Sequence, residues 1–232
     1  MVFHRSICGV VFDMDGLLVD TETYFRDSLI ATAAAWGHDL PLSLFQRIIG
    51  VPNDESVATL LDHFGPDFDA KGLYAACWER FHETVDLETL LKAGVVELLD
   101  HLDGLGVPRA IATSSPRQAV DHHLGPSGLV DRFDTIVAKG DYPRSKPAPD
   151  PYLVAANRLG LDPADCLALE DSHNGVRSAH AAGMMTIMVP DLLDPTEEMH
   201  DKCIHVARTL HEVHELLLAN RPTAPMMYPA RR

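Results

Sequence analysis

Two aspartates separated by one residue follow a short apolar run near the start of the chain. The run from Ile7 to Phe12 is rich in β-forming residues, and Asp13, Asp15 and Gly16 come directly after it. Side chains two residues apart on an extended chain point the same way, so both carboxylates would share one face at the carboxyl end of a strand. Two anions this close repel each other unless a cation or a proton lies between them. The pair therefore predicts a site of chemistry.

Further polar side chains follow the other apolar runs that we expect to be strands. They are hydroxyls after the second run, an ammonium in the loop after the third and carboxylates after the fourth, namely Thr113, Ser114, Ser115, Lys146, Glu170 and Asp171. Ligands of open α/β sheets bind outside the carboxyl ends of the strands, so these groups would meet Asp13 at one edge. Carboxylates, hydroxyls and one ammonium together are typical of phosphoryl transfer.

The carboxylates at this edge predict a magnesium site. Mg²⁺ prefers a few carboxylates together with water and phosphate oxygens, and Asp13, Asp171 and Glu170 are the candidate ligands. The metal and Lys146 would neutralise the oxygens of a transferring phosphoryl group, and Thr113 would hydrogen-bond one of them. The acidic chain would in this way meet an anionic substrate with local cations.

A carboxylate can itself act as the nucleophile and form an acyl phosphate. A neighbouring acid would then protonate the leaving oxygen and later activate water, and Asp15 is placed for that role. Taken singly, Asp13 could be a turn residue, Lys146 a solvated lysine, and Glu170 with Asp171 a helix-capping pair. Their occurrence together, each after its own strand, favours a shared site.

The spacing of apolar residues predicts which segments of the chain are strands and which are helices. Residues 7–13 are expected to form a buried strand, and the pattern from about residue 21 to 91 is helical almost throughout. Gly and Pro punctuate the expected helices of this block, at 23–36, 43–49, 53–64 and 69–85. From residue 94 on, helices at 94–105, 117–124, 150–159 and 174–182 alternate with strands at 109–112, 135–138, 166–169 and 185–189. A last helix is expected at 205–218.

Alternating strands and helices of these lengths predict a parallel sheet with helices on both faces. The first strand must join this sheet, so the helical block is an insertion after it. We therefore expect a doubly wound, Rossmann-like α/β core of residues 1–20 and 91–232. The inserted α-helical bundle, residues 21–90, would form a cap domain.

Composition excludes several classes of partner. The chain of 232 residues carries 19 basic and 34 acidic residues, a net charge of −15, which argues against a nucleic-acid or membrane surface. No apolar run reaches the length of a membrane span. The four cysteines show no CxxC spacing and are expected to be free thiols in a reducing compartment. We expect a cytoplasmic monomer that binds a small phosphorylated metabolite.

Four segments carry a resemblance to a known family. DMDGLLVDTE, ATSS, SKPAPD and LEDSHNGVRSAHAAG resemble, in order and spacing, the four motifs of the haloacid dehalogenase-like superfamily, and the match runs from about residue 7 to 190. The helical insertion resembles the small α-helical cap of the β-phosphoglucomutase-like subfamily. The resemblance implies that Asp13 is the nucleophile and a Mg²⁺ ligand. It implies that Asp15 is the acid/base and a metal ligand through its carbonyl.

The resemblance implies the remaining roles as well. Thr113 and Lys146 would bind phosphate, and Glu170 and Asp171 would complete the metal site. Dehalogenases that attack carbon lack the second aspartate, and the ATPase pumps carry Thr there. Asp15 therefore favours phosphatases and phosphomutases.

The sequence departs from the mutase pattern at two positions. Phe25 stands where β-phosphoglucomutases have a His, and Asn53 stands where they have the cap Arg that grips the second phosphate of a bisphosphate. A hydrolase of one phosphate has no such need. Ser114, Arg117 and Asn53 are further candidate contacts to substrate or phosphate.

These inferences predict a Mg²⁺-dependent phosphatase that hydrolyses a small phosphorylated metabolite, such as a sugar phosphate, through an aspartyl-phosphate on Asp13. A β-phosphoglucomutase-like phosphomutase is one alternative. The other is a non-catalytic metabolite-binding protein on the same fold. Such a protein would show a broken motif, and none of the four motifs is broken here.

Overall fold

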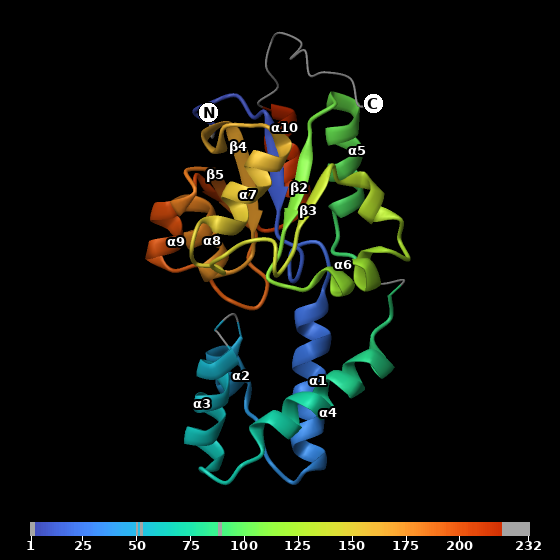
Figure 1. Cartoon of the computed structure of the whole chain (residues 1–232), viewed down its shortest axis with the longest axis vertical. Helices are drawn as coiled ribbons and strands as arrows, with labels where there is room; N and C mark the ends of the chain where they lie inside the picture. The colour runs from blue at the N-terminus through green and yellow to red at the C-terminus, as the bar shows by residue number, and fades with distance from the viewer. Residues whose placement is uncertain (1–2, 50, 52, 88–89, 220–232) are drawn as a thin grey trace. The chain divides into compact units, whose positions relative to one another are not determined.

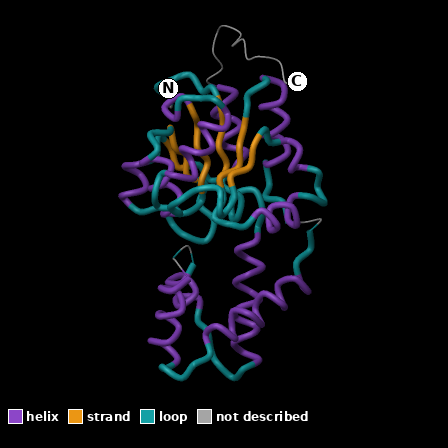
Figure 2. The backbone as a smooth tube through the Cα atoms, in the orientation of Figure 1, coloured by secondary structure: helices purple, strands orange, loops and turns teal. Residues whose placement is uncertain are grey.

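The chain divides into two compact units. The computed structural model describes residues 3–49, 51, 53–87 and 90–219. The described parts of Met1–Val19 and Leu91–Arg232 form one unit, and those of Asp20–Leu90 form the other (Figure 1). The first unit contains all the described strands, and the second is built from helices (Figure 2).

The first unit is built on one sheet of six parallel strands in the order β3-β2-β1-β4-β5-β6. The strands are β1 (Gly9–Phe12), β2 (Arg109–Ala112), β3 (Thr135–Val137), β4 (Cys166–Glu170), β5 (Met185–Met188) and β6 (His205–Val206). This order confirms the predicted doubly wound α/β core and reverses between β1 and β4, where ligands of such sheets bind. Phe12 of β1 lies level with Ile111 of β2 and Leu169 of β4, so the carboxyl ends of the three strands are aligned.

Helices cover both faces of the sheet. They are α5 (Val95–Leu105), α6 (Arg117–Leu124), α7 (Asp150–Leu159), α8 (His173–Ala181), α9 (Glu197–Lys202) and α10 (Leu210–Ala219), with 3₁₀ turns at Leu129–Arg132 and Pro163–Asp165. Helix α7 packs on the β1 to β3 side of one face and α8 on β4 and β5, whereas α5 packs against α10 (Figure 1). The carboxyl edge of the sheet is left for the loops.

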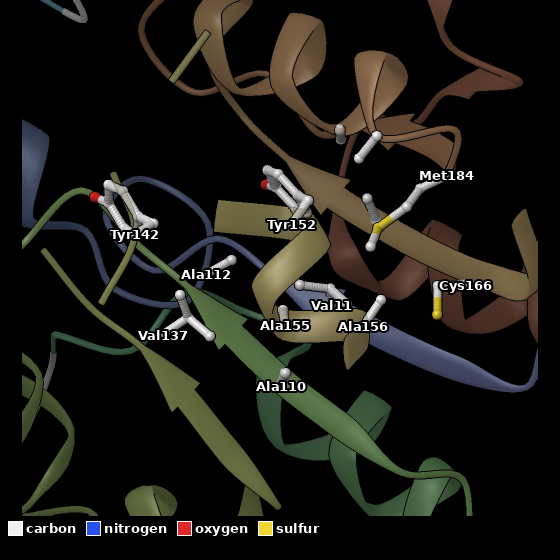
Figure 3. Close-up of a cluster of buried hydrophobic side chains, with 13 residues drawn as sticks. Val11, Ala110, Ala112, Val137, Tyr142, Tyr152, Ala155, Ala156, Cys166 and Met184 are labelled. Atoms are coloured by element: carbon white, nitrogen blue, oxygen red, sulfur yellow. The ribbon is translucent and has the colours of Figure 1, made fainter. Parts of the chain in front are cut away.

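A cluster of buried side chains joins α7 to the sheet. Successive side chains of a strand alternate between faces, and Val11 of β1 with Ala110 of β2 point toward α7. The small side chains there let Tyr152 and Ala155 of α7 approach the sheet closely (Figure 3). Tyr142 lies at the border of the same cluster. The cluster therefore fixes α7 and Tyr152 close to the carboxyl ends of the strands.

The second unit consists of α1 (Thr21–Ala35), α2 (Leu42–Ile48), α3 (Asn53–Phe64) and α4 (Ala70–Thr84), and its described residues contain no strand, as predicted. Helix α1 packs against α4. Asp69 starts α4 as its N-cap, since its Oδ1 accepts a hydrogen bond of 2.9 Å from the Gly72 amide. Within the described parts of both units, no helix has the length and apolar character needed to cross a membrane.

The sequence prediction is wrong in one region. The helix expected at 205–218 is instead the short strand β6 followed by α10, which begins only at Leu210, and α9 was not predicted. The Glu212 amide bonds Thr209 Oγ1 (3.3 Å), and Glu212 Oε2 accepts from the Arg208 amide (3.0 Å). These bonds resemble a capping box and fix the start of α10. The two residues of β6 are thus left free to pair with β5.

Candidate active site

The turn after β1 places Asp13 at the carboxyl edge of the sheet. The Asp13 amide donates to the Leu169 carbonyl of β4 (3.0 Å), and the Gly16 amide donates to the Val19 carbonyl (2.8 Å). Gly16 has a φ of 82°, in the left-handed region that favours glycine. A β-carbon at this position would also lie 2.3 Å from Asp171 Oδ2. Gly16 therefore makes the turn and admits a carboxylate beside it.

Lys146 joins two carboxylates from different strands. Its Nζ lies 2.5 Å from Asp13 Oδ1 and 2.6 Å from Glu170 Oε1, and all three side chains are buried. The predicted convergence of β1, β4 and the Lys146 loop on one point is therefore present in the structure. A buried ammonium held by two carboxylates is a strong charge-assisted arrangement.

Burial and charge act on this group in opposite directions. Burial raises the pKa of Asp13 to about 8, aided by the Glu170 and Asp15 charges and opposed by the Lys146 ammonium. For Lys146, burial lowers the pKa, but the two carboxylates outweigh it and raise the pKa above its ordinary value. Lys146 therefore stays charged, and a cation bound beside Asp13 would lower the pKa of that carboxyl again.

Glu170 is held from two sides. Its Oε1 accepts from Lys146 and from the Tyr152 hydroxyl (2.7 Å). Its Oε2 accepts from the amides of Asp171 and Ser172 and from the Ser172 hydroxyl, each at 3.1 Å. Both oxygens of this fully buried carboxylate are engaged, and the five bonds fix its orientation.

The acidic groups at this edge fit a hard divalent cation. One oxygen each of Asp13, Glu170 and Asp171 lie within 4.8 Å of one another. Asp191, in the loop after β5, lies beside Gly16 but outside this group of three, and its Oδ1 pairs with Lys92 Nζ at 2.5 Å, while its buried Oδ2 has no hydrogen-bond partner among the described residues. An all-oxygen donor set of this kind suits Mg²⁺. Because both Glu170 oxygens are engaged, Asp13 and Asp171 are the better placed direct ligands.

Asp15 occupies a different environment from Asp13. Its Oδ2 accepts a hydrogen bond of 2.7 Å from Ser115 Oγ, and its Oδ1 lies 4.0 Å from Nδ1 of the buried His123. More than a quarter of the Asp15 side chain is exposed, whereas Asp13 is almost fully buried. The two neighbouring carboxylates thus have separate partners and separate access to solvent.

The loop after β2 brings its hydroxyls to the same edge. Thr113 is buried, and its Oγ1 accepts from the Ser115 amide (2.9 Å), which leaves the hydroxyl hydrogen able to donate. The Tyr142 hydroxyl donates to the Thr113 carbonyl (3.0 Å) and steadies the loop. Ser114 is exposed at this edge.

One predicted contact, Arg117, is engaged away from the cluster, and a second, Asn53, cannot be placed against it. Arg117 begins α6, and its exposed guanidinium donates to Asp121 Oδ1 (2.9 Å), one turn along the same helix. Asn53 begins α3 in the other unit, and its side chain lies outside the described residues. Arg117 is therefore held by its own helix, and Asn53 stays a prediction.

Sequence reasoning placed Ser115 at this edge without giving it a role, and it missed Tyr152 and Asp191. Asp191 carries a detectable signal, because it follows β5 at the edge where the other carboxylates lie. Ser115 is adjacent to the predicted Ser114, and only the turn geometry decides which hydroxyl reaches Asp15. Tyr152 carries no such signal, since an aromatic residue on a helix is ordinarily part of the core.

Comparison with known proteins agrees with this geometry. Residues 7–183 match the family described as haloacid dehalogenase-like hydrolase. The chain is 35% identical to YhcW of Bacillus subtilis over 196 residues, which cover 84% of this chain and 89% of YhcW. It is 32% identical to the phosphorylated carbohydrates phosphatase of Thermotoga maritima over 183 residues, 77% of this chain and 83% of that protein. The crystal structure of CbbY from Rhodobacter sphaeroides in complex with phosphate matches with a TM-score of 0.70 and 26% identity, over 89% and 96% of the two chains.

Proposed function

The chain belongs to the haloacid dehalogenase-like hydrolases, and on this premise we propose that it is a Mg²⁺-dependent phosphatase acting through an aspartyl-phosphate on Asp13. The observation that carries the proposal is the contrast between two neighbouring carboxylates. Asp13 is buried against Lys146, whereas Asp15 is partly exposed and bonded to Ser115. Paired carboxylates in different environments can take the roles of nucleophile and acid/base.

The two roles give a balanced reaction. An Asp13 oxygen attacks phosphorus as the bond to the leaving oxygen breaks, and protonated Asp15 gives its proton to that oxygen. The Asp15 carboxylate then takes a proton from water, whose oxygen attacks phosphorus and releases inorganic phosphate and the Asp13 carboxylate. Ser115 holds the Asp15 carboxylate in place for both proton transfers.

Lys146 and Thr113 are the proposed phosphate contacts. The Lys146 ammonium is held beside the nucleophile and would offset the charge of the phosphoryl oxygens, and the Thr113 hydroxyl can donate to one of them. Mg²⁺, held by Asp13, Asp171 and the Asp15 carbonyl, would supply further charge stabilisation when bound. Ser114 is a candidate for an additional contact.

A sugar phosphate or a similar phosphorylated metabolite is the proposed substrate. The similarity to a phosphorylated carbohydrates phosphatase and to a CbbY structure with phosphate supports this class. Phe25 packs on Trp78 with ring centroids 4.9 Å apart inside the helical unit, and its ring cannot carry a proton or a charge as a His can. Phe25 therefore favours hydrolysis over the mutase reaction.

The proposed setting is the cytoplasm, with residues 21–90 as a cap domain on the core of residues 1–20 and 91–232, in a monomeric enzyme. All four cysteines are free thiols, which agrees with a reducing compartment. The strongly acidic composition again argues against nucleic-acid partners.

A phosphatase screen tests the proposal. The purified protein with Mg²⁺ is expected to release inorganic phosphate from at least one member of a panel of phosphorylated metabolites. Asp13→Asn should reduce the rate by about a thousandfold or more while circular dichroism shows an intact fold, because the amide is not a nucleophile.

The alternatives give different results in the same screen. An isomerised sugar phosphate formed from β-glucose 1-phosphate with a bisphosphate primer would identify a mutase. No phosphate release from any member of the panel would favour a non-catalytic binding protein. Full activity of Asp13→Asn would overturn the covalent mechanism.

A further inference from the structure

We propose that Tyr152 is a positioning residue that acts through Glu170 to hold the Lys146 ammonium against Asp13. The inference rests on the proposed phosphatase function, because Lys146 is there a phosphate contact. The inference also gives Glu170, predicted from the sequence as a metal ligand, the role of orienting Lys146. Tyr152 lies on α7, beneath the site, and none of the four sequence motifs that predict the site includes it.

Tyr152 contacts both members of the Lys146–Glu170 pair. Its hydroxyl donates to Glu170 Oε1 at 2.7 Å, the same oxygen that Lys146 Nζ approaches at 2.6 Å. Its ring lies under the ammonium, with Nζ 5.1 Å from the ring centroid, within range of a cation–π interaction. The hydroxyl and the ring thus constrain the carboxylate and the ammonium together.

The tyrosine is itself held rigidly. It is fully buried and belongs to the hydrophobic cluster between α7 and the sheet, together with Val11, Ala112 and Ala155 (Figure 3). Protein interiors are close-packed, so the ring cannot move without displacing these neighbours. The position of the hydroxyl is therefore set by the core of the protein.

Glu170 is clamped from the opposite side by the start of α8. Ser172 is the N-cap of α8, and its hydroxyl donates to Glu170 Oε2 while accepting from the Gly175 amide (3.1 Å). A β-carbon on Gly175 would lie 1.8 Å from Glu170 Oε1, so the carboxylate rests directly on the first turn of the helix. With α8 fixing one oxygen and Tyr152 the other, Glu170 can present Oε1 to Lys146 in one direction only.

This arrangement has a consequence for Lys146. An ammonium has three N–H donors, and two of them are directed to Asp13 and Glu170. Once these two directions are fixed, the direction of the third donor is fixed as well. We assign it to a phosphoryl oxygen. Loss of the Tyr152 hydroxyl would let Glu170 and Lys146 reorient together, and the alignment of the third donor would suffer.

Tyr152→Phe tests the proposal, since it removes the hydroxyl and keeps the ring. We expect kcat/KM to fall about tenfold, mostly through kcat, because the lysine contact strengthens in the transition state. The affinity for inorganic phosphate, measured by calorimetry, should fall about fivefold. The affinity for Mg²⁺ should change less than twofold, because the hydroxyl acts on Lys146 and not on the metal.

Thr186→Val is the matched control. This substitution also removes a fully buried hydroxyl, but from β5. There the Thr186 hydroxyl donates a hydrogen bond of 3.3 Å to the Met184 carbonyl. We expect its kinetic constants to match those of the natural chain. If both variants lose activity only in proportion to their loss of folded protein, Tyr152 is merely structural and the proposal fails.

A further variant and the activity of the natural chain separate the possible failures. Ser172→Ala loosens Glu170 from the other side and should reproduce the loss of phosphate affinity, even if Tyr152→Phe does not fold. If the natural chain is active and Tyr152→Phe has the same activity and phosphate affinity, the role of Tyr152 is overturned while the proposed function stands. An inactive natural chain would overturn the proposed function, and the calorimetric phosphate affinities would still decide the role of Tyr152.

Discussion

Asp13 and Asp15 stand two residues apart and have different partners, and this difference could not have been predicted from their spacing. The spacing indicated two carboxylates at one strand end, and both lie just past the end of β1, but in the turn, beyond the extended residues to which the rule of alternating side chains applies. Which carboxylate meets Lys146 and which meets Ser115 depends on the turn at Gly16 and on loops far along the chain. The residue types could therefore be predicted, but their hydrogen-bond partners could not.

Gly175→Ala gives a prediction at the same scale. The new methyl group would collide with Glu170 Oε1, 1.8 Å away, so the carboxylate must move. We expect a loss of about 1–3 kcal/mol in unfolding free energy, as for overpacked core sites, and a loss of phosphate affinity. The control is Gly104→Ala in α5, where no atom beyond the helix's own neighbouring backbone lies within 4 Å of the new carbon. It should stabilise the fold by about 0.5–1 kcal/mol, because alanine is the better helix former. Equal effects of the two variants in chemical denaturation would contradict the close approach.

Most elements could be predicted from the sequence because their apolar periods and their Gly or Pro boundaries agree. The expected bounds of α3, β2, α6 and α7 are those observed. The failure at 205–218 has a physical cause: β6 pairs along only two residues, too few to show an alternating pattern. The Thr209-x-x-Glu212 spacing was the local signal that could have placed the start of α10. Short edge strands of this kind are fixed by the sheet they join.

Glu212 gives a prediction at the scale of the element. Hydrogen bonds from the Arg208 amide and from His205 lower the pKa of Glu212 to about 2. A carboxyl with a lower pKa in the folded state stabilises the fold above its unfolded pKa, about 4.3, and this contribution is lost as the pH falls toward 2. Glu212→Gln should therefore lower the Tm at pH 7, by the equivalent of about 1 kcal/mol or less after solvent screening. The difference in Tm between Glu212→Gln and the natural chain should be smaller at pH 3.5 than at pH 7. Glu215→Gln, at an exposed position on the same helix, is the control. A Tm difference for Glu212→Gln that does not change with pH would contradict the lowered pKa of Glu212.

The molecule as a whole carries a net charge of −15, and three of its buried carboxylates, Asp13, Glu170 and Asp171, gather at one edge of the sheet. Mg²⁺ that binds the folded state alone stabilises it by about 2.7 kcal/mol at one hundred times its Kd. We expect added MgCl₂ to raise the Tm by several degrees in a thermal melt. Asp171→Asn should remove most of this rise, because it deletes a proposed ligand. NaCl at equal ionic strength controls for screening, and an equal rise with NaCl would argue against a specific site.

The chain leaves the sheet-containing unit after Val19 and re-enters it at Leu91, and these two residues pair as an isolated antiparallel bridge. The Lys92 amide continues the contact by donating to the Leu18 carbonyl (3.0 Å). The points where the chain leaves and re-enters the first unit are thus hydrogen-bonded to each other, and we call this pairing of residues 18–19 with 91–92 the seam. In evolutionary terms, such a seam makes the helical unit exchangeable: another insertion can begin and end at the same two residues without stretching the sheet. The proposed catalytic carboxylates can then stay constant while the inserted unit diversifies, and protein engineers can graft a foreign insertion at these two residues.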